Sequence, residues 1–95
     1  MSVEVRIPTI LRKHTGGARA VEAKGSTVRE VIEQLDRDHP GLRAAILAED
    51  GDMHRFINIY LNDEDVRFSG ELETPVSDGD VVSILPAVAG GAAGG

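Results

Sequence analysis

One stretch of the chain constrains the fold more than any other, because it combines a helix start signal with a long apolar stripe. Apolar residues recur at the spacing i, i+3, i+4 and i+7 that aligns one helix face, namely Val28, Val31, Ile32 and Leu35. Ser26 or Thr27 can cap this helix, and Thr27 to Glu30 fits a capping box. Pro40 ends the helix near His39. The sequence therefore predicts one main helix that must bury its stripe against another layer.

Strand patterns flank this helix on both sides. Val3, Val5 and Ile7 alternate with polar residues, as in a half-buried strand. Residues 9–17 are expected to form a connection, with its turn at Gly16-Gly17. A weaker strand with Val21 inward follows, so the chain should begin with a hairpin. The predicted strands cover residues 3–7, 18–23, 56–61, 66–68 and 81–85. Leu42, Ile46 and Leu47 indicate a short second helical segment.

The order of these elements predicts the topology. A helix between two strand groups lets the first and last strands pair in parallel at the centre of one sheet. The expected class is α+β, with a mixed sheet of four to five strands and one main helix across one face. This is the β-grasp arrangement. We expect residues 1–88 to form this domain and residues 89–95 to form a flexible Gly/Ala tail.

Composition excludes several classes of function. The formal net charge of −6 argues against nucleic-acid binding and suits a partner with a basic docking face. The chain has no cysteine, which excludes disulfides, thiolate catalysis and zinc–thiolate sites. No apolar run is long enough to span a membrane, and no secretion signal is evident. We therefore expect a cytoplasmic protein.

The C-terminal tail is the unusual feature of the sequence. After Val88 no side chain is larger than a methyl group, and the last residues are Gly and Ala. Glycine lets a backbone pass close to a partner, and the terminal carboxylate is the one reactive group in this segment. Taken alone, such a tail favours the interpretation as a frayed terminus that has no function.

Stretches along most of the chain carry a family resemblance. They are residues 7–12, 14–17, 54–56, 58–60, 62–70 and 84–91, the last being Ile84-Leu85-Pro86-Ala87-Val88-Ala89-Gly90-Gly91. With these stretches in this order, the chain resembles the ubiquitin-like sulfur carriers of the ThiS/MoaD type. The resemblance is strongest to the CysO-type carriers of actinobacterial cysteine biosynthesis.

The resemblance implies a function that depends on partner enzymes. In this family an E1-like adenylyltransferase/sulfurtransferase uses ATP to adenylate the terminal glycine, and sulfur then replaces the adenylate to give a thiocarboxylate. The carrier has no catalytic residue and binds no cofactor of its own. For the CysO type, a PLP-dependent synthase accepts the sulfur, and a metalloprotease then cuts cysteine from the C-terminus.

The position of the reacting glycine is left open by the sequence. The family ends at its Gly-Gly, whereas this chain continues past Gly91 for four residues. The sequence favours Gly95 as the adenylation and thiocarboxylate site, with Gly91 as the alternative. Gly90, Gly91 and Gly94 are the residues expected to thread the partner's channel.

The alternation of the strands predicts a docking surface. Phe56, Tyr60 and Leu85 should lie on the sheet face opposite the helix, because Ile57, Ile59 and Ile84 face the core. Ser83 and Asn58 share that outer face. The alternative is that the aromatic pair only packs along the sheet.

Other functions are compatible with the same fold and the same tail. Related carriers supply thiamin, molybdopterin or thiosugar synthesis. A ubiquitin-like modifier would instead form a lasting amide between its terminal glycine and a lysine of another protein. A β-grasp binding module with an inert tail is the third possibility.

The sequence gives little support for a metal site, a calcium site or a phosphate-binding loop. His14, His39 and His54 are widely spaced, which is typical of surface histidines rather than of a metal site. The acidic residues at 63–65, 78 and 80 fit charged turns, and no calcium-loop pattern is present. Gly16-Gly17 lacks the Gly-Lys-Ser/Thr of a phosphate-binding loop. We therefore expect no bound metal.

Overall fold

The structure is a computed structural model that describes residues 2–54 and 57–86 of the 95-residue chain. Its elements are β1 (Ser2–Arg6), the 3₁₀ helix η1 (Thr9–His14), β2 (Ala20–Lys24), α1 (Val28–Asp38), α2 (Leu42–Ile46), β3 (Ile57–Leu61), β4 (Glu64–Asp65), the 3₁₀ helices η2 (Val66–Phe68) and η3 (Glu71–Glu73), and β5 (Val81–Pro86). Phe56 and the whole Gly/Ala tail lie outside the described residues.

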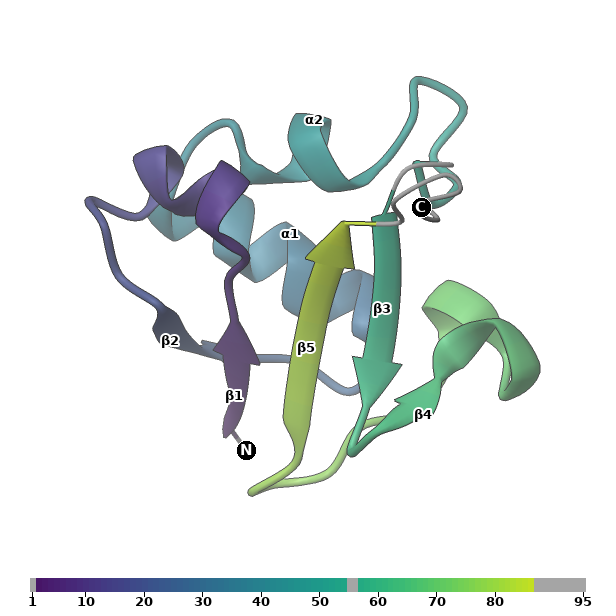
Figure 1. Cartoon of the computed structure of the whole chain (residues 1–95). Helices are drawn as coiled ribbons and strands as arrows, with labels where there is room; N and C mark the ends of the chain where they lie inside the picture. Colours follow the sequence, from purple (N-terminus) through teal and green to yellow (C-terminus); the bar gives the residue numbers. More distant parts are fainter. Residues whose placement is uncertain (1, 55–56, 87–95) are drawn as a thin grey trace, which may run out of the picture.

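The strands form one five-stranded sheet in the order β2-β1-β5-β3-β4 (Figure 1). The central strands β1 and β5 are parallel, with Val5 opposite Val82. β2 pairs antiparallel with β1, and β3 pairs antiparallel with β5 and β4. This mixed sheet with a parallel central pair is the predicted β-grasp arrangement.

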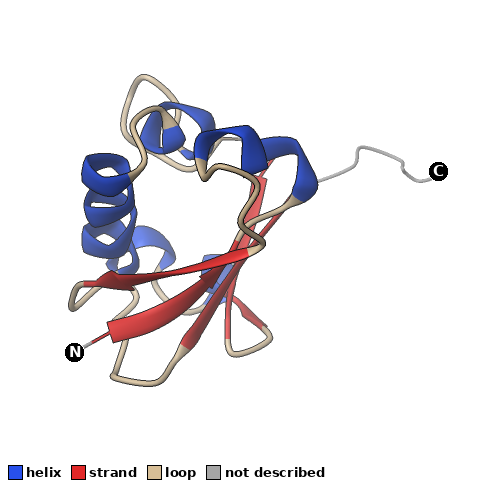
Figure 2. Cartoon of the chain, turned by 90° about the vertical axis from the view of Figure 1, so that its left-hand side faces the viewer, coloured by secondary structure: helices blue, strands red, loops and turns tan. Residues whose placement is uncertain are grey.

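The main helix forms where its cap and stripe predicted. The Thr27 side chain accepts a hydrogen bond from the Glu30 backbone N–H at 3.2 Å. The Glu30 carboxylate accepts from the Ser26 N–H at 2.8 Å, one residue before the position of a reciprocal capping box. All four stripe residues are buried, namely Val28, Val31, Ile32 and Leu35. They pack with the inward residues of the strands into one core, so α1 lies across one side of the sheet (Figure 2).

One prediction about local structure was wrong, and the structure adds detail to two others. Residues 66–68 form the 3₁₀ helix η2 rather than a strand, because the Asp65 side chain accepts a hydrogen bond from the Arg67 N–H at 2.8 Å and turns the chain. The connection expected at residues 9–17 contains η1, which buries Leu11 against the core. In β2, Ala23 is more deeply buried than the predicted inward residue Val21.

Gly25 is required by its close approach to the first turn of α1. A Cβ atom at this position would lie 2.8 Å from the backbone nitrogen of Val31 and 2.9 Å from Cβ of Glu30. The backbone of α1 cannot move away from such a Cβ atom without disrupting the capped first turn of the helix. We expect Gly25→Ala to lower the free energy of unfolding by about 2 kcal/mol, measured by urea denaturation. The neighbouring control Ser26→Ala should change it by less than about 0.5 kcal/mol, and equal effects would contradict the steric argument.

A second stability prediction concerns the turn that precedes β5. The Asp80 carboxylate accepts hydrogen bonds from the Asn62 side-chain amide at 3.0 Å and from the Ser77 backbone N–H at 2.8 Å. These bonds, the one from Asn62 foremost, hold the pKa of Asp80 below its ordinary value. The folded state therefore favours the ionised carboxyl group. Its stabilising contribution is present above the ordinary aspartate pKa and is lost as the pH falls through the lowered folded pKa.

We therefore expect Asp80→Asn to be less stable than the parent at pH 7. The gap between their urea midpoints should narrow as the pH is lowered towards the acid range, where the parent also loses its carboxylate. Midpoints measured at several pH values test this expectation. A gap that stays constant with pH would show that the charge on Asp80 does not contribute.

Candidate functional site

The candidate site lies on the sheet face opposite α1, at the C-terminal half of β5. Val82 and Ile84 are buried, each 1% exposed, whereas Leu85 on the other face is 46% exposed. The antiparallel register sets Asn58 opposite Leu85 and Tyr60 opposite Ser83. Tyr60 and Leu85 are thus diagonal neighbours on one face. The structure brings together these two predicted docking residues with Ser83 and Asn58, while the third, Phe56, lies outside the described residues.

An arginine fixes the β3 side of this surface. The Arg67 guanidinium donates hydrogen bonds to the side-chain oxygen of Asn58 and to the carbonyl oxygen of Ile57. This contact holds η2 against β3. The next residue, Phe68, is 86% exposed, an unusually high exposure for an aromatic side chain. The sequence interpretation missed both residues because it treated residues 66–68 as a strand; the Asp65–Arg67 spacing is the signal of a side-chain-capped turn that could have found them.

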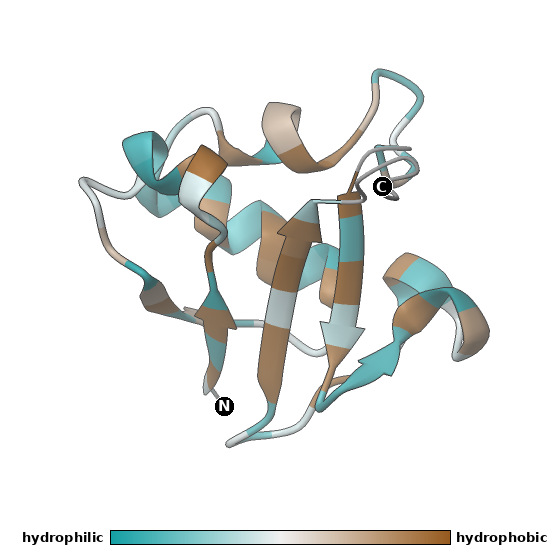
Figure 3. Ribbon diagram, in the orientation of Figure 1, coloured by the Kyte–Doolittle hydropathy of each residue, from teal (hydrophilic) through white to brown (hydrophobic). Residues whose placement is uncertain are grey.

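A hollow of about 520 Å³ borders the same surface on the β1 side. Its lining combines apolar side chains with three arginines and one acidic residue, Glu4. The other residues that matter for the site are Ile10, Leu85, Pro86, Arg6, Arg12 and Arg19. Ile10, on η1, is 59% exposed. The sequence interpretation missed this hollow because η1 was expected to be a simple connection. Figure 3 shows β5, apolar for most of its length, between β1 and β3.

The other groups considered from the sequence do not converge. Within residues 2–54 and 57–86, no three His, Asp or Glu side chains are close enough to bind a metal ion together. His14 lies against Gly41, where an added Cβ would be 2.8 Å from the imidazole Nδ1. Asp80 is held in its turn by Asn62 and Ser77. None of the helices in the described part of the chain is both long and apolar enough to cross a membrane.

The geometry of the site favours protein docking. It presents exposed apolar side chains and guanidinium groups on the open face of a rigid sheet. The chain leaves this surface at Pro86, the last residue of β5.

Comparisons with known proteins identify the family of this chain. The model of the ThiS family matches residues 5–91. The sulfur carrier protein CysO of Mycobacterium tuberculosis is 55% identical over 93 residues, which span 96% of this chain and 100% of that protein. Its crystal structure superposes with a TM-score of 0.87 at 53% identity, covering 90% of this chain and 99% of that chain.

A solved complex gives a further match. The Amycolatopsis orientalis BexX/CysO complex contains a chain with a TM-score of 0.87 and 60% identity to this one, covering 93% of this chain and 98% of that chain. A CysO protein of this fold therefore binds another protein. The resemblance drawn from the sequence is confirmed: the chain belongs to the ThiS family of sulfur carrier proteins.

Proposed function

We propose that this chain carries sulfur as a thiocarboxylate on its C-terminal glycine and delivers it for cysteine synthesis. The observation that carries the proposal is the 55% identity to CysO along the whole length of that carrier. An E1-like enzyme adenylates the glycine. A carboxylate oxygen of the terminal glycine attacks the α-phosphorus of ATP, and pyrophosphate leaves. A sulfur nucleophile then attacks the acyl carbon, and AMP leaves.

The chemistry explains why the carrier needs no reactive side chain of its own. A carboxylate is a poor electrophile, and the mixed anhydride with AMP supplies a good leaving group. The partners supply ATP binding and the catalytic groups, while the carrier supplies the terminal glycine and the docking surface that brings it to the partner. A PLP-dependent synthase then accepts the sulfur, and a metalloprotease releases cysteine from the carrier.

The extent of the family match bears on which glycine reacts. The sequence favours Gly95, with Gly91 as the alternative. The family model ends at residue 91, and CysO aligns over its full length with 96% of this chain. Both observations support Gly91 as the reacting end, after a peptidase has removed residues 92–95. Gly90 and Gly91 then thread the partner's channel, whereas Gly94 has no role in the mature carrier.

The docking surface of the carrier is the outer sheet face. Tyr60 and Leu85 provide its apolar contacts, with Ser83 and Asn58 between them. The solved BexX/CysO complex supports a protein-binding role for a chain of this fold. Phe56 belongs to the proposed surface on the grounds of strand alternation in the sequence.

Pyrophosphate exchange tests the first step directly. The purified E1-like enzyme of the host is incubated with ATP and labelled pyrophosphate, with this chain ending at Gly91 or without any carrier. We expect label to appear in ATP only when the carrier is present, because the exchange requires an acyl-adenylate. Exchange at the same rate in both reactions would contradict the proposed function.

A further inference from the structure

The N-terminal segment has a charge opposite to that of the whole chain. Between Glu4 and Glu22 the sequence contains four of the chain's ten Lys and Arg residues and no Asp or Glu. The formal net charge of the whole chain is −6. The segment that spans the end of β1, η1 and the start of β2 is therefore a cationic region in an otherwise acidic protein.

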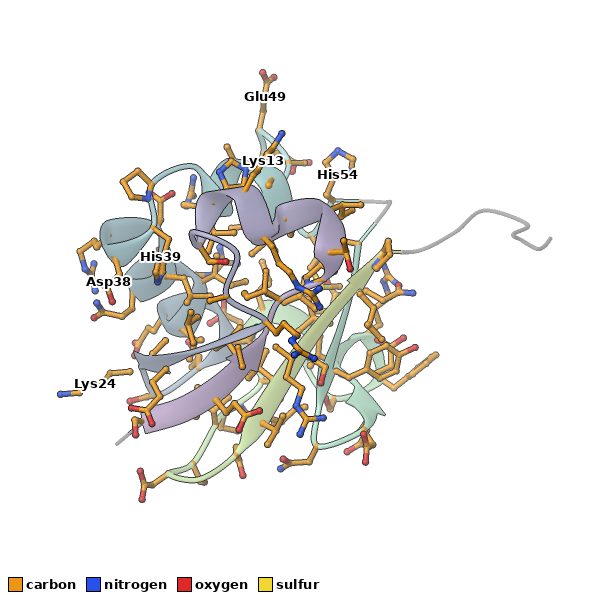
Figure 4. All side chains as sticks on the ribbon, turned by 60° about the vertical axis from the view of Figure 1, so that its left-hand side comes forward. Lys13, Lys24, Asp38, His39, Glu49 and His54 are labelled. Carbon is orange, nitrogen blue, oxygen red and sulfur yellow. The ribbon has the colours of Figure 1, made fainter. Side chains whose placement is uncertain are left out.

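The fold places three of these cations around the hollow beside β5. Arg6 lies at the end of β1, Arg12 lies on η1, and Arg19 precedes β2. They line the hollow together with Ile10, Leu85 and one carboxylate, that of Glu4, so cations outnumber acids there, and we call this surface the arginine groove. Figure 4 shows Lys13 on η1, and it shows Lys24 far from the C-terminal end of β5.

The guanidinium groups of the arginine groove retain free donors. Arg6 forms an ion pair with Glu4 at 3.0 Å, but both side chains are about half exposed and such a pair is weak. Arg12 uses its Nε–H on the carbonyl oxygen of Ile7 at 3.1 Å. Arg19 donates no side-chain hydrogen bond to any residue that the structure describes. Internal contacts therefore leave most of this charge available.

We propose that the arginine groove is the docking site for an acidic rim on the partner that receives the C-terminal segment. In this arrangement Asp and Glu side chains of the partner pair with Arg19 and its neighbours, and an apolar residue packs on Ile10. The inference rests on the proposed function, and it adds the chemistry of the partner surface. Net charge alone suggested a basic partner face, whereas the local charge at the point of docking requires the opposite.

The lining of the groove favours a protein over a phosphate-bearing ligand. Ile10, Leu85 and Pro86 form an apolar side of the groove. A protein surface can cover this side with apolar residues while its carboxylates pair with the arginines, whereas a phosphate gains nothing from apolar contacts. Paired charges at the rim of an interface select the correct partner and its orientation. The groove also borders Pro86, from which the C-terminal segment continues, so docking there would align that segment with the partner's channel.

Charge reversal at Arg19 tests this inference. The parent and all variants end at Gly91, and their rate of adenylation by the host E1-like enzyme is measured against carrier concentration at low and high salt. We expect Arg19→Glu to raise the KM for the carrier about tenfold at low salt, and about twofold near 0.5 M salt, where surface charges are screened. Arg19→Lys should stay within about threefold of the parent. Lys24→Glu makes the same charge change away from the groove and should alter KM by less than about twofold.

The outcomes separate the inference from the function on which it rests. If the parent chain is not adenylated, the proposed function fails. If it is adenylated but Arg19→Glu and Lys24→Glu behave alike, the function stands and the arginine groove is not the docking site. If Arg19→Glu raises the KM for ATP rather than for the carrier, the groove serves the nucleotide and the inference is overturned. Equal melting temperatures of all variants exclude a folding effect.

Discussion

Replacement of Leu85 by Glu should lower kcat/KM for adenylation of this chain by about a hundredfold. Leu85 is the exposed apolar residue shared by the outer sheet face and the arginine groove. Glu at this position would remove an apolar anchor, and its carboxylate would offset the charge of the groove arginines and repel the partner's acidic rim. Because the side chain points away from the core, the melting temperature should change little.

The matched control for this prediction is Ala44→Glu on α2, an exposed position outside the proposed surface. It adds the same side chain and should leave kcat/KM within about twofold of the parent. If both variants were adenylated at the parent rate, the outer sheet face would not be the docking surface. If Leu85→Glu unfolded, the more conservative Leu85→Ser would carry the comparison.

Truncation of the tail should have the largest effect of all. A chain ending at Val88 lacks every candidate glycine and should form no detectable thiocarboxylate, a loss of at least about a thousandfold, because its end cannot reach the nucleotide. A chain ending at Gly91 should react without any peptidase. The full chain should react only after residues 92–95 are removed.

Mass spectrometry of the three proteins after incubation with ATP, sulfide and the E1-like enzyme checks this prediction. The melting temperature of the chain ending at Val88 controls for folding. Thiocarboxylate on Gly95 of the untrimmed chain would show that the longer arm is the functional one. A normal rate for the chain ending at Val88 would remove the tail from the mechanism.

The alternation and stripe patterns were sufficient to predict the main layers of the fold. The inward residues of the first strand pattern, Val3, Val5 and Ile7, are buried, and so are Val82 and Ile84 of the last strand. Strand side chains alternate, so a shift by one residue would expose all of them. The apolar stripe of α1 is the helical surface that covers these strand residues. The segment that was mispredicted depends on a side-chain bond to the backbone, that of Asp65 with the Arg67 N–H, which overrides strand preference.

The candidate site was predictable only in part, for a similar reason. Strand alternation placed Tyr60 and Leu85 on the outer face, and the register of β3 against β5 made them neighbours. The arginine groove depends on η1, which brings Ile10 and Arg12 beside β5 from a distant part of the sequence. No periodicity in residues 9–17 indicates that contact, so only the folded chain reveals it.

The most direct test of the account is the intact mass of this protein isolated from its native host, with fragmentation of its C-terminal peptide. We expect a fraction of the protein to end at Gly91, with residues 92–95 absent and one terminal oxygen replaced by sulfur. If every molecule carried an unmodified carboxylate, in cells that are actively making cysteine, the carrier function would be contradicted. A terminal glycine joined to lysines of other proteins would identify a modifier instead.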